Sequence, residues 1–136
     1  MMTIKTGAII LIAVVAATVV FGQAQDNVSA ALSFAFRHGK AGRLAEFFPE
    51  QGRVRLAIAS VNIASGDYSS TQAVALLQQA FDNFETISLA LNGGRDALKI
   101  EWKTKNRNTG EQKSIVLYIA IQTHQNTSVI TSIRGS

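Results

Sequence analysis

The stretch GDYSSTQAVALLQQAF, residues 66–81, decides the fold, because it places a strongly marked helix between two stretches that alternate like strands. Ser69 and Gln72 have the spacing of a capping box, in which each side chain pairs a backbone N–H left free at a helix start. The apolar residues that follow recur at helical spacing and form one face: Ala73, Leu76, Leu77, Ala80, Phe81 and Phe84. The sequence therefore predicts an amphipathic helix over residues 70–84.

Two further helices are predicted on the N-terminal side. Apolar residues recur at helical spacing from Val28 to Phe36, and Gly39 stands where a helix would end in a left-handed residue. A second, shorter helix ends at Pro49, because proline has no N–H to donate and its ring clashes with the preceding turn. Its inner side is predicted to carry Leu44, Phe47 and Phe48.

Strand periodicity replaces helical periodicity from Gly52 onward. The alternation slips near Ala59, which we interpret as a bulge or bend in one strand. After the helix come four more strands, at residues 86–91, 97–107, 114–123 and 127–133, with a hairpin turn at Asn108–Gly110. This order predicts an α+β fold in which a curved antiparallel sheet wraps around the helices and helix 70–84 lies as a lid on its concave face.

The first 24 residues have the features of a secretory signal peptide. Lys5 precedes an apolar run, Gly7–Phe21. The tripeptide Gly22-Gln23-Ala24 then places small residues at the two positions that signal peptidase recognises before its cleavage site. A retained anchor is the alternative, but 15 residues of helix span roughly 22 Å, short of a hydrocarbon core of ~30 Å. A lipoprotein anchor is excluded because the chain has no cysteine. We expect export to the periplasm or the exterior and no stable membrane span after cleavage.

Residues 25–136 then form a single domain. Without cysteine it has no disulfides, so packing alone must hold the fold. Removing Lys5 leaves 12 basic and 9 acidic side chains, a formal net charge of +3. The chain has no run of five like charges, and export makes phosphate backbones unsuitable partners, so nucleic-acid binding is not predicted.

Three stretches carry a resemblance to a known family. GKAGRLAEFF (residues 39–48), VRLAI (54–58) and YSSTQAVALLQQAF (68–81) are similar to stretches of a secreted family known as domain of unknown function 4783. That family resembles the nuclear-transport-factor-two-like cone fold, whose superfamily includes ketosteroid isomerases, polyketide cyclases and many noncatalytic domains. The resemblance covers residues 27–84 and extends to the closing strands only in pattern. The chain departs from the family at residues 91–94, where an aromatic and a histidine-glycine turn are expected.

The predicted interior has no catalytic group. Enzymes with the cone fold place Asp, His or Tyr in an apolar pocket, where desolvation tunes proton transfer. The inward strand positions here are apolar: Leu98, Ile100, Trp102, Ile115, Leu117, Ile119 and Ile121. Trp102 is interpreted as core packing or, alternatively, as the floor of a small apolar ligand pocket. Such a pocket is predicted to be lined by Leu77, Phe81, Phe84, Trp102 and Leu117.

The remaining polar residues have structural interpretations. His38 is predicted to lie at a helix end and His124 at the surface beside a turn. The two histidines have no acidic residue at ligand spacing, so neither a metal site nor a cofactor is predicted. Asp67 and Asp96 border glycines and are interpreted as turn formers.

The outer face of the sheet is the second predicted site. Val116, Tyr118 and Ala120 face away from the apolar side and form a candidate homodimer surface. A basic stripe is interpreted as a solvated strand face, the alternative being an anion-binding surface; it consists of Lys99, Lys103, Lys105 and Arg107.

Three function classes follow. The first is an exported noncatalytic domain that binds a small apolar ligand or a protein partner. The alternatives are a cone-fold isomerase- or cyclase-like enzyme and a structural accessory of an envelope assembly. A buried ionisable group in the cavity would distinguish the enzyme from the first class.

Cleavage after Ala24 is testable by mass. Intact-mass measurement of the protein recovered from its native host should give the mass of residues 25–136, because the apolar run and small-residue pattern fit signal peptidase. A mass that retains Met1 to Ala24 would contradict the prediction.

Overall fold

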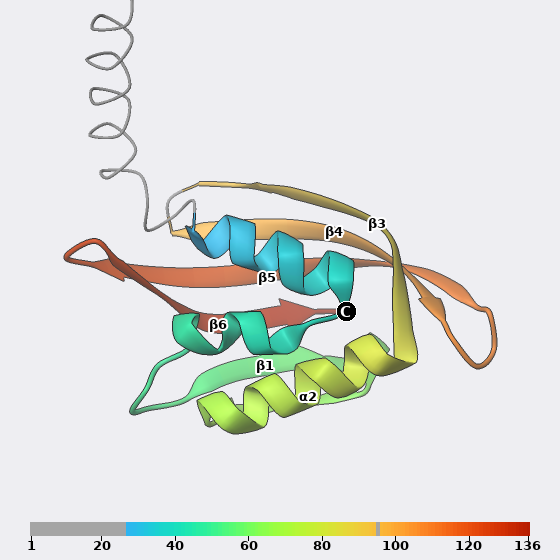
Figure 1. The fold of residues 1–136 in the computed structure, drawn as a ribbon, viewed down its shortest axis with the longest axis horizontal. Helices are drawn as coiled ribbons and strands as arrows, with labels where there is room; N and C mark the ends of the chain where they lie inside the picture. Colours follow the sequence, from blue (N-terminus) through green and yellow to red (C-terminus); the bar gives the residue numbers. More distant parts are fainter. Residues whose placement is uncertain (1–26, 95) are drawn as a thin grey trace, which may run out of the picture.

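A six-stranded sheet curves around the helices in the computed structural model of the protein (Figure 1). The structure describes residues 27–94 and 96–136, so the predicted signal peptide lies outside the described residues. The strands are β1 (Val54–Ile58), β2 (Ile63–Tyr68), β3 (Phe84–Gly93), β4 (Ala97–Asn106), β5 (Gln112–His124) and β6 (Thr127–Gly135). Their order in the sheet is β2-β1-β6-β5-β4-β3. The predicted α+β class is confirmed.

The sheet is mixed, which corrects the prediction that it is antiparallel throughout. Strand β6 pairs with β1 in parallel, with Arg55 opposite Ser132 and Ala57 opposite Arg134. The other neighbouring strands are antiparallel. Strand β2 pairs with one side of β1, and β6, the last strand of the chain, pairs with the other side. This parallel pair joins residues almost 80 positions apart, so no local pattern signals it.

The predicted bend near Ala59 is instead a chain reversal, so the single strand predicted there is wrong. A short 3-10 helix, η2 (Ala59–Val61), and Asn62 in the left-handed region at φ 66° turn the chain from β1 into β2. The reversal contains neither glycine nor proline, which is why the sequence resembles an interrupted strand. Asp67, predicted to form a turn, lies on β2 and pairs with Arg55 at 3.3 Å.

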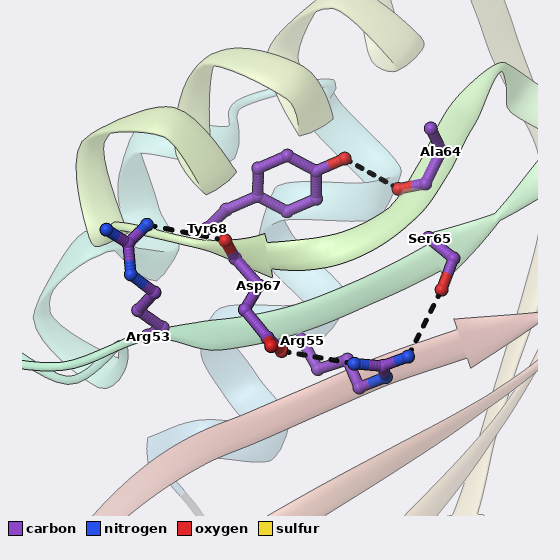
Figure 2. Close-up of polar contacts among 6 residues, drawn as sticks. All are labelled: Arg53, Arg55, Ala64, Ser65, Asp67 and Tyr68. Carbon is purple, nitrogen blue, oxygen red and sulfur yellow. Dashed lines mark hydrogen bonds and ion pairs between the residues drawn. The ribbon is translucent and has the colours of Figure 1, made fainter.

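Polar contacts protect the exposed edge of the sheet at β2 (Figure 2). The Tyr68 hydroxyl donates to the Ala64 carbonyl at 2.7 Å, and Arg55 Nη2 donates to Ser65 Oγ at 3.3 Å. Backbone groups on an open edge can template pairing with other chains. Tyr68 satisfies one of these groups from within the strand, and the charged pair beside it disfavours such pairing.

Besides η2, the described residues form three helical segments that accompany the sheet. The first helix spans residues 27–38, and η1 (Ala41–Phe47) is a 3-10 helix that ends before Pro49. The long helix α2 (Ser70–Asn83) lies beside β1, while the first helix crosses β4 and β5 in the view of Figure 1. Buried residues of all three segments join those of the sheet in one core cluster. No helix in the described part of the chain is long and apolar enough to cross a membrane.

A single glutamine on α2 fixes the turn between the first helix and η1. The helix ends at Gly39, whose φ of 66° suits glycine, and the Lys40 N–H donates to the Ala35 carbonyl at 2.9 Å. Gln78 Oε1 accepts from the Ala41 N–H, and Nε2 donates to the Gly39 carbonyl, both at 2.9 Å. The turn is therefore held by a neighbouring element as well as by its own backbone.

A bulge in β3 keeps its apolar side chains in the core. The register with β4 shifts between Thr86 and Ser88, which leaves Ile87 as the extra residue, 43% exposed. Thr86 lies opposite Thr104 before the bulge, and Leu89 lies opposite Trp102 after it. Without the extra residue, Leu89 would point to the outer face, because side chains alternate along a strand.

The predicted capping box is confirmed and gives a stability test. Ser69 Oγ accepts from the Gln72 N–H at 3.2 Å, and Gln72 Oε1 accepts from the Ser69 N–H at 3.0 Å. Removing a capping hydroxyl costs about 1 kcal/mol, so Ser69→Ala should lower the melting temperature by ~4 to 8 °C in a calorimetric scan. The control is Ser70→Ala, which leaves both bonds of the box in place. Equal melting temperatures for Ser69→Ala and the unmodified protein would contradict the prediction.

Candidate functional site

The structure brings the five predicted pocket residues together inside the core. All five belong to one buried cluster, and each has less than a tenth of its surface exposed: Leu77, Phe81, Phe84, Trp102 and Leu117. Helix α2 supplies Leu77 and Phe81, and β3, β4 and β5 supply the other three. Of the five, Phe81 and Trp102 have rings in contact, so the predicted lining as a whole stays a prediction.

The side chain of Phe36 packs against two of the five, Phe81 and Trp102. The Phe36 ring, from the first helix, lies edge-on to Trp102 at 5.0 Å between centroids and to Phe81 at 5.0 Å. Phe81 and Trp102 are themselves 6.0 Å apart in a T-shaped arrangement. Edge-to-face pairs at these distances add about 0.5 to 1.5 kcal/mol each beyond the burial of the rings. A ligand entering between Phe81 and Trp102 would have to displace Phe36.

The indole of Trp102 is also fixed by a hydrogen bond. Its Nε1–H donates to Thr86 Oγ1 at 2.8 Å, and the same hydroxyl donates to the Phe36 carbonyl at 2.6 Å. Thr86 thus links the sheet to the last turns of the first helix. This role was not predicted, because the bulge at Ile87 breaks the alternation that would have marked Thr86 as inward-facing.

The buried part of the described chain is almost entirely apolar. Its buried polar residues are Thr104 and Ser128, and neither titrates near neutral pH. Thr104 Oγ1 reaches the Lys113 carbonyl at 3.5 Å, and the Ser128 hydroxyl lies 3.1 Å from that of Thr123. Over residues 27–94 and 96–136, every buried side-chain nitrogen or oxygen has a hydrogen-bond partner. The interior therefore offers packing and satisfied hydroxyls.

The polar residues considered as ligands or bases lie at the surface. His38 and His124 are exposed, as predicted, and Asp96 is exposed at a bend before β4. Among the described residues, no group of three or more His, Cys, Asp or Glu side chains is arranged to hold a metal ion.

The outer face of β5 presents an exposed aromatic between two cations. Tyr118 is 53% exposed, and its partners on the neighbouring strands are Lys99 of β4 and Arg134 of β6. Val116 and Ala120, the other two residues of the candidate dimer surface, are half-buried on either side of it. All three predicted residues therefore share one face of the sheet. Arg134, which the sequence analysis did not identify, completes the group.

The basic stripe is partly neutralised. Lys99 Nζ lies 3.8 Å from Glu101 Oε1, and both side chains are about half exposed. Exposed pairs of this kind contribute about 0 to 1 kcal/mol to the free energy of unfolding. The main effect of this pair is therefore to offset the positive charge of Lys99. Lys103 and Lys105 continue along β4, whereas Arg107 lies in the turn after the strand, which corrects its predicted place in the stripe.

Several depressions open on the strands, and two of them adjoin residues considered above. One, of 520 Å³, lies beside Tyr118 and is lined by Val116, Tyr118, Arg134, Gly135 and Ser136. A Cβ at Gly135 would lie 2.5 Å from Leu117 Cδ2, so a larger residue there would require the leucine side chain to shift. The other, of 770 Å³, joins the loop before β1 to the β5–β6 hairpin. Its lining is mainly polar, with Pro49, Gly52, Arg53, Gln122, Thr123, His124, Gln125, Thr127, Val129 and Thr131.

Comparison with solved structures identifies the fold. A domain of unknown function 4783 protein from Bacteroides uniformis is 22% identical, with a TM-score of 0.62 over 81% of this chain and 96% of that chain. A second member, from Bacteroides ovatus, is 19% identical, with a TM-score of 0.60 over 80% and 94%. A candidate isomerase from Rhodopseudomonas palustris is 12% identical, with a TM-score of 0.60 over 82% and 87%.

These likenesses confirm the nuclear-transport-factor-two-like fold predicted from the sequence and support the resemblance to the family of unknown function 4783. No family model matches the chain, and no curated protein matches it. At these identities the shared property is the fold, so a neighbour's activity is not transferred to this chain.

The Trp102–Thr86 contact can be tested with Thr86→Val, which keeps the shape of the side chain and removes its hydroxyl. The indole N–H and the Phe36 carbonyl lose their shared partner, so the free energy of unfolding should fall by about 1 to 3 kcal/mol. Urea titration followed by tryptophan fluorescence measures it, because Trp102 is the single tryptophan of the chain.

The matched control is Thr104→Val, at the position opposite Thr86, where the hydroxyl makes only a long hydrogen bond. The Thr104 variant should lose less stability than the Thr86 variant. Equal losses, or a larger loss at Thr104, would contradict the importance of the link.

Proposed function

We propose that the chain is an exported, noncatalytic binding domain that recognises a protein partner through the outer face of its sheet. The observation that carries the proposal is the exposed ring of Tyr118 set between Lys99 and Arg134, above a depression that continues to Gly135. The partner is a second copy of the chain or another protein of the envelope.

The filled interior supports a noncatalytic role. General acid–base catalysis needs a titratable group within hydrogen-bond reach of a bound substrate. In the described part of the chain the buried residues are apolar apart from two hydroxyl side chains, and the Phe36 ring packs edge-on against Trp102. A small apolar ligand meets the same obstacle. The isomerase- or cyclase-like alternative has fold likeness alone in its favour.

The outer face has features of a protein-binding surface. Tyrosine and arginine are over-represented among residues that dominate binding energy, and they act best within a patch that excludes water. Tyr118 and Arg134 are register neighbours, and the half-buried side chains of Val116 and Ala120 border the ring on its own strand. A partner that covered this group would bury an aromatic ring together with small apolar side chains.

The charges around Tyr118 influence the choice of partner. Lys99, Lys103 and Lys105 would repel their own copies across a two-fold axis unless acids lie between them. Glu101 supplies one such acid, because it pairs with Lys99 and lies opposite Val116. A homodimer through this face is therefore compatible with its charges, and an acidic partner protein would fit them better.

A photo-crosslinking amino acid at position 118 tests the proposal in the native host. Irradiation should give a discrete adduct, because Tyr118 is placed at the centre of the contact. An adduct of twice the mass of the domain identifies a second copy, and any other discrete mass identifies a different protein. The control carries the same amino acid at Asp82, which is exposed on α2.

The variant Val116→Lys gives a second test of the proposal, because a lysine beside Tyr118 places an added charge in the contact. The adduct from position 118 should be lost in this variant, and sedimentation at micromolar concentration should show loss of any dimer. The proposal fails if no adduct forms at position 118, or if positions 82 and 118 give the same products.

A further inference from the structure

A second exposed aromatic lies on a different surface, among cations. Phe34, on the first helix, is 45% exposed. Its neighbours on the first helix and at the start of η1 are basic, and with it they form the Phe34 patch: Phe34, Arg37, His38, Lys40 and Arg43. The four neighbours are exposed, as is the ring.

The ring and two of these groups are in direct contact. The His38 ring lies 4.6 Å from the Phe34 ring between centroids, at an angle of 47°. The Arg43 guanidinium carbon lies 5.8 Å from the centre of the same ring, within the range of a cation–π contact. Arg37 is fixed nearby through hydrogen bonds to Ser33 Oγ at 3.0 Å and to the Leu89 carbonyl at 3.3 Å.

The patch is built on a rigid corner. Arg43 reaches Phe34 because the chain reverses at Gly39, and Gln78 holds both ends of that reversal with hydrogen bonds to Gly39 and Ala41. The aromatic ring and its cations are therefore arranged before any partner arrives, which reduces the entropy lost on binding. An exposed ring in this setting is not a by-product of a flexible loop.

The charge of the patch is strongly one-sided. Three of its members, Arg37, Lys40 and Arg43, are cationic. In the described part of the chain, the elements packed here also carry acids, namely Glu46 on η1, Glu85 on β3 and Asp82 on α2, and Asp82 already accepts from Gln78 Nε2 at 3.0 Å. The surface that complements this patch is anionic and can accept an aromatic ring.

We infer that the Phe34 patch docks the domain on an anionic phospholipid surface, with Phe34 entering the interfacial region and Arg37, Lys40 and Arg43 contacting headgroup phosphates. Aromatic rings favour the membrane–water interface, and basic side chains are attracted to anionic lipid headgroups. This combination distinguishes the patch from the outer sheet face, where Glu101 neutralises part of the charge beside Tyr118.

The position of the patch in the chain favours a membrane over other anionic partners. The apolar run ends at Phe21, and five residues separate it from the first helix. Five extended residues reach at most about 18 Å, and the helix from residue 27 to Phe34 adds about 10 Å. While the run is in a bilayer, as the proposed export requires, the length of the chain keeps Phe34 within roughly 30 Å of the run. This tether raises the local concentration of the patch at a membrane surface.

Vesicle binding of residues 25–136 tests this inference without the leader. The core cluster is built entirely from residues between Val28 and Ile133, so this chain contains the complete core. It should sediment with vesicles of phosphatidylglycerol and phosphatidylcholine in equal parts and remain in solution with phosphatidylcholine alone. Raising the salt from ~0.1 M to ~0.5 M should weaken binding, because the Debye length falls about twofold.

Two pairs of variants locate the site. Phe34→Ala and Arg43→Glu should each lower the partition coefficient about tenfold, from the loss of a buried ring and the reversal of one cation. The controls make the same kinds of change on the outer sheet face: Tyr118→Ala removes an aromatic of similar exposure, and Lys103→Glu reverses one exposed cation. Both controls should bind within about twofold of the unmodified domain. Circular dichroism verifies that every variant is folded.

Three results would overturn the inference. The first is an absence of binding to the anionic vesicles. The second is an equal loss in Arg43→Glu and Lys103→Glu, which would mean that the net charge of the domain drives binding. The third is unchanged binding in Phe34→Ala together with a loss in Tyr118→Ala, which would move the contact to the outer sheet face.

Discussion

The contact between Trp102, Phe36 and Thr86 constrains most of the fold. A buried indole N–H without a partner costs about 1 to 3 kcal/mol, so Thr86 must face inward to accept it. Leu89 must also face inward, and the odd spacing between the two requires the bulge at Ile87. The Phe36 carbonyl, bonded to the same hydroxyl, then fixes where the first helix crosses the sheet. Helix α2 completes the arrangement by placing Phe81 against both rings.

The features predicted correctly from sequence are those determined locally. The capping box at Ser69, the left-handed end at Gly39 and the alternation of β4 all depend on residues close together in the chain. The features that were missed depend on distant partners or on unusual local chemistry. The parallel pairing of β1 with β6 is long-range, and the reversal at η2 uses Asn62 where a glycine would have been recognised. For the candidate site, the sequence grouped Phe81 with Trp102, but no pattern pairs either with Phe36.

Tyr118 and Phe34 show how similar compositions give different surfaces. Both are exposed aromatic rings with cations beside them. Tyr118 lies on a broad sheet whose neighbouring strand also carries Glu101, so the face combines both signs of charge over a wide area. Phe34 lies on the first helix, where the Arg43 guanidinium and the His38 ring both contact its ring. The first geometry suits a folded protein of matching shape, and the second suits a soft, uniformly anionic layer.

A filled interior is consistent with a small domain that has no disulfides. Stabilities of such domains are about 5 to 15 kcal/mol, and opening a cavity by removing a buried phenylalanine costs about 3 to 5 kcal/mol. An empty ligand pocket in place of the Phe36 side chain would therefore lower the free energy of unfolding by a large fraction until the ligand bound. Binding through Tyr118 or Phe34 uses side chains that contribute little to the core, because each already exposes about half of its surface. The fold can thus supply recognition at its surface while the Trp102 cluster remains closed.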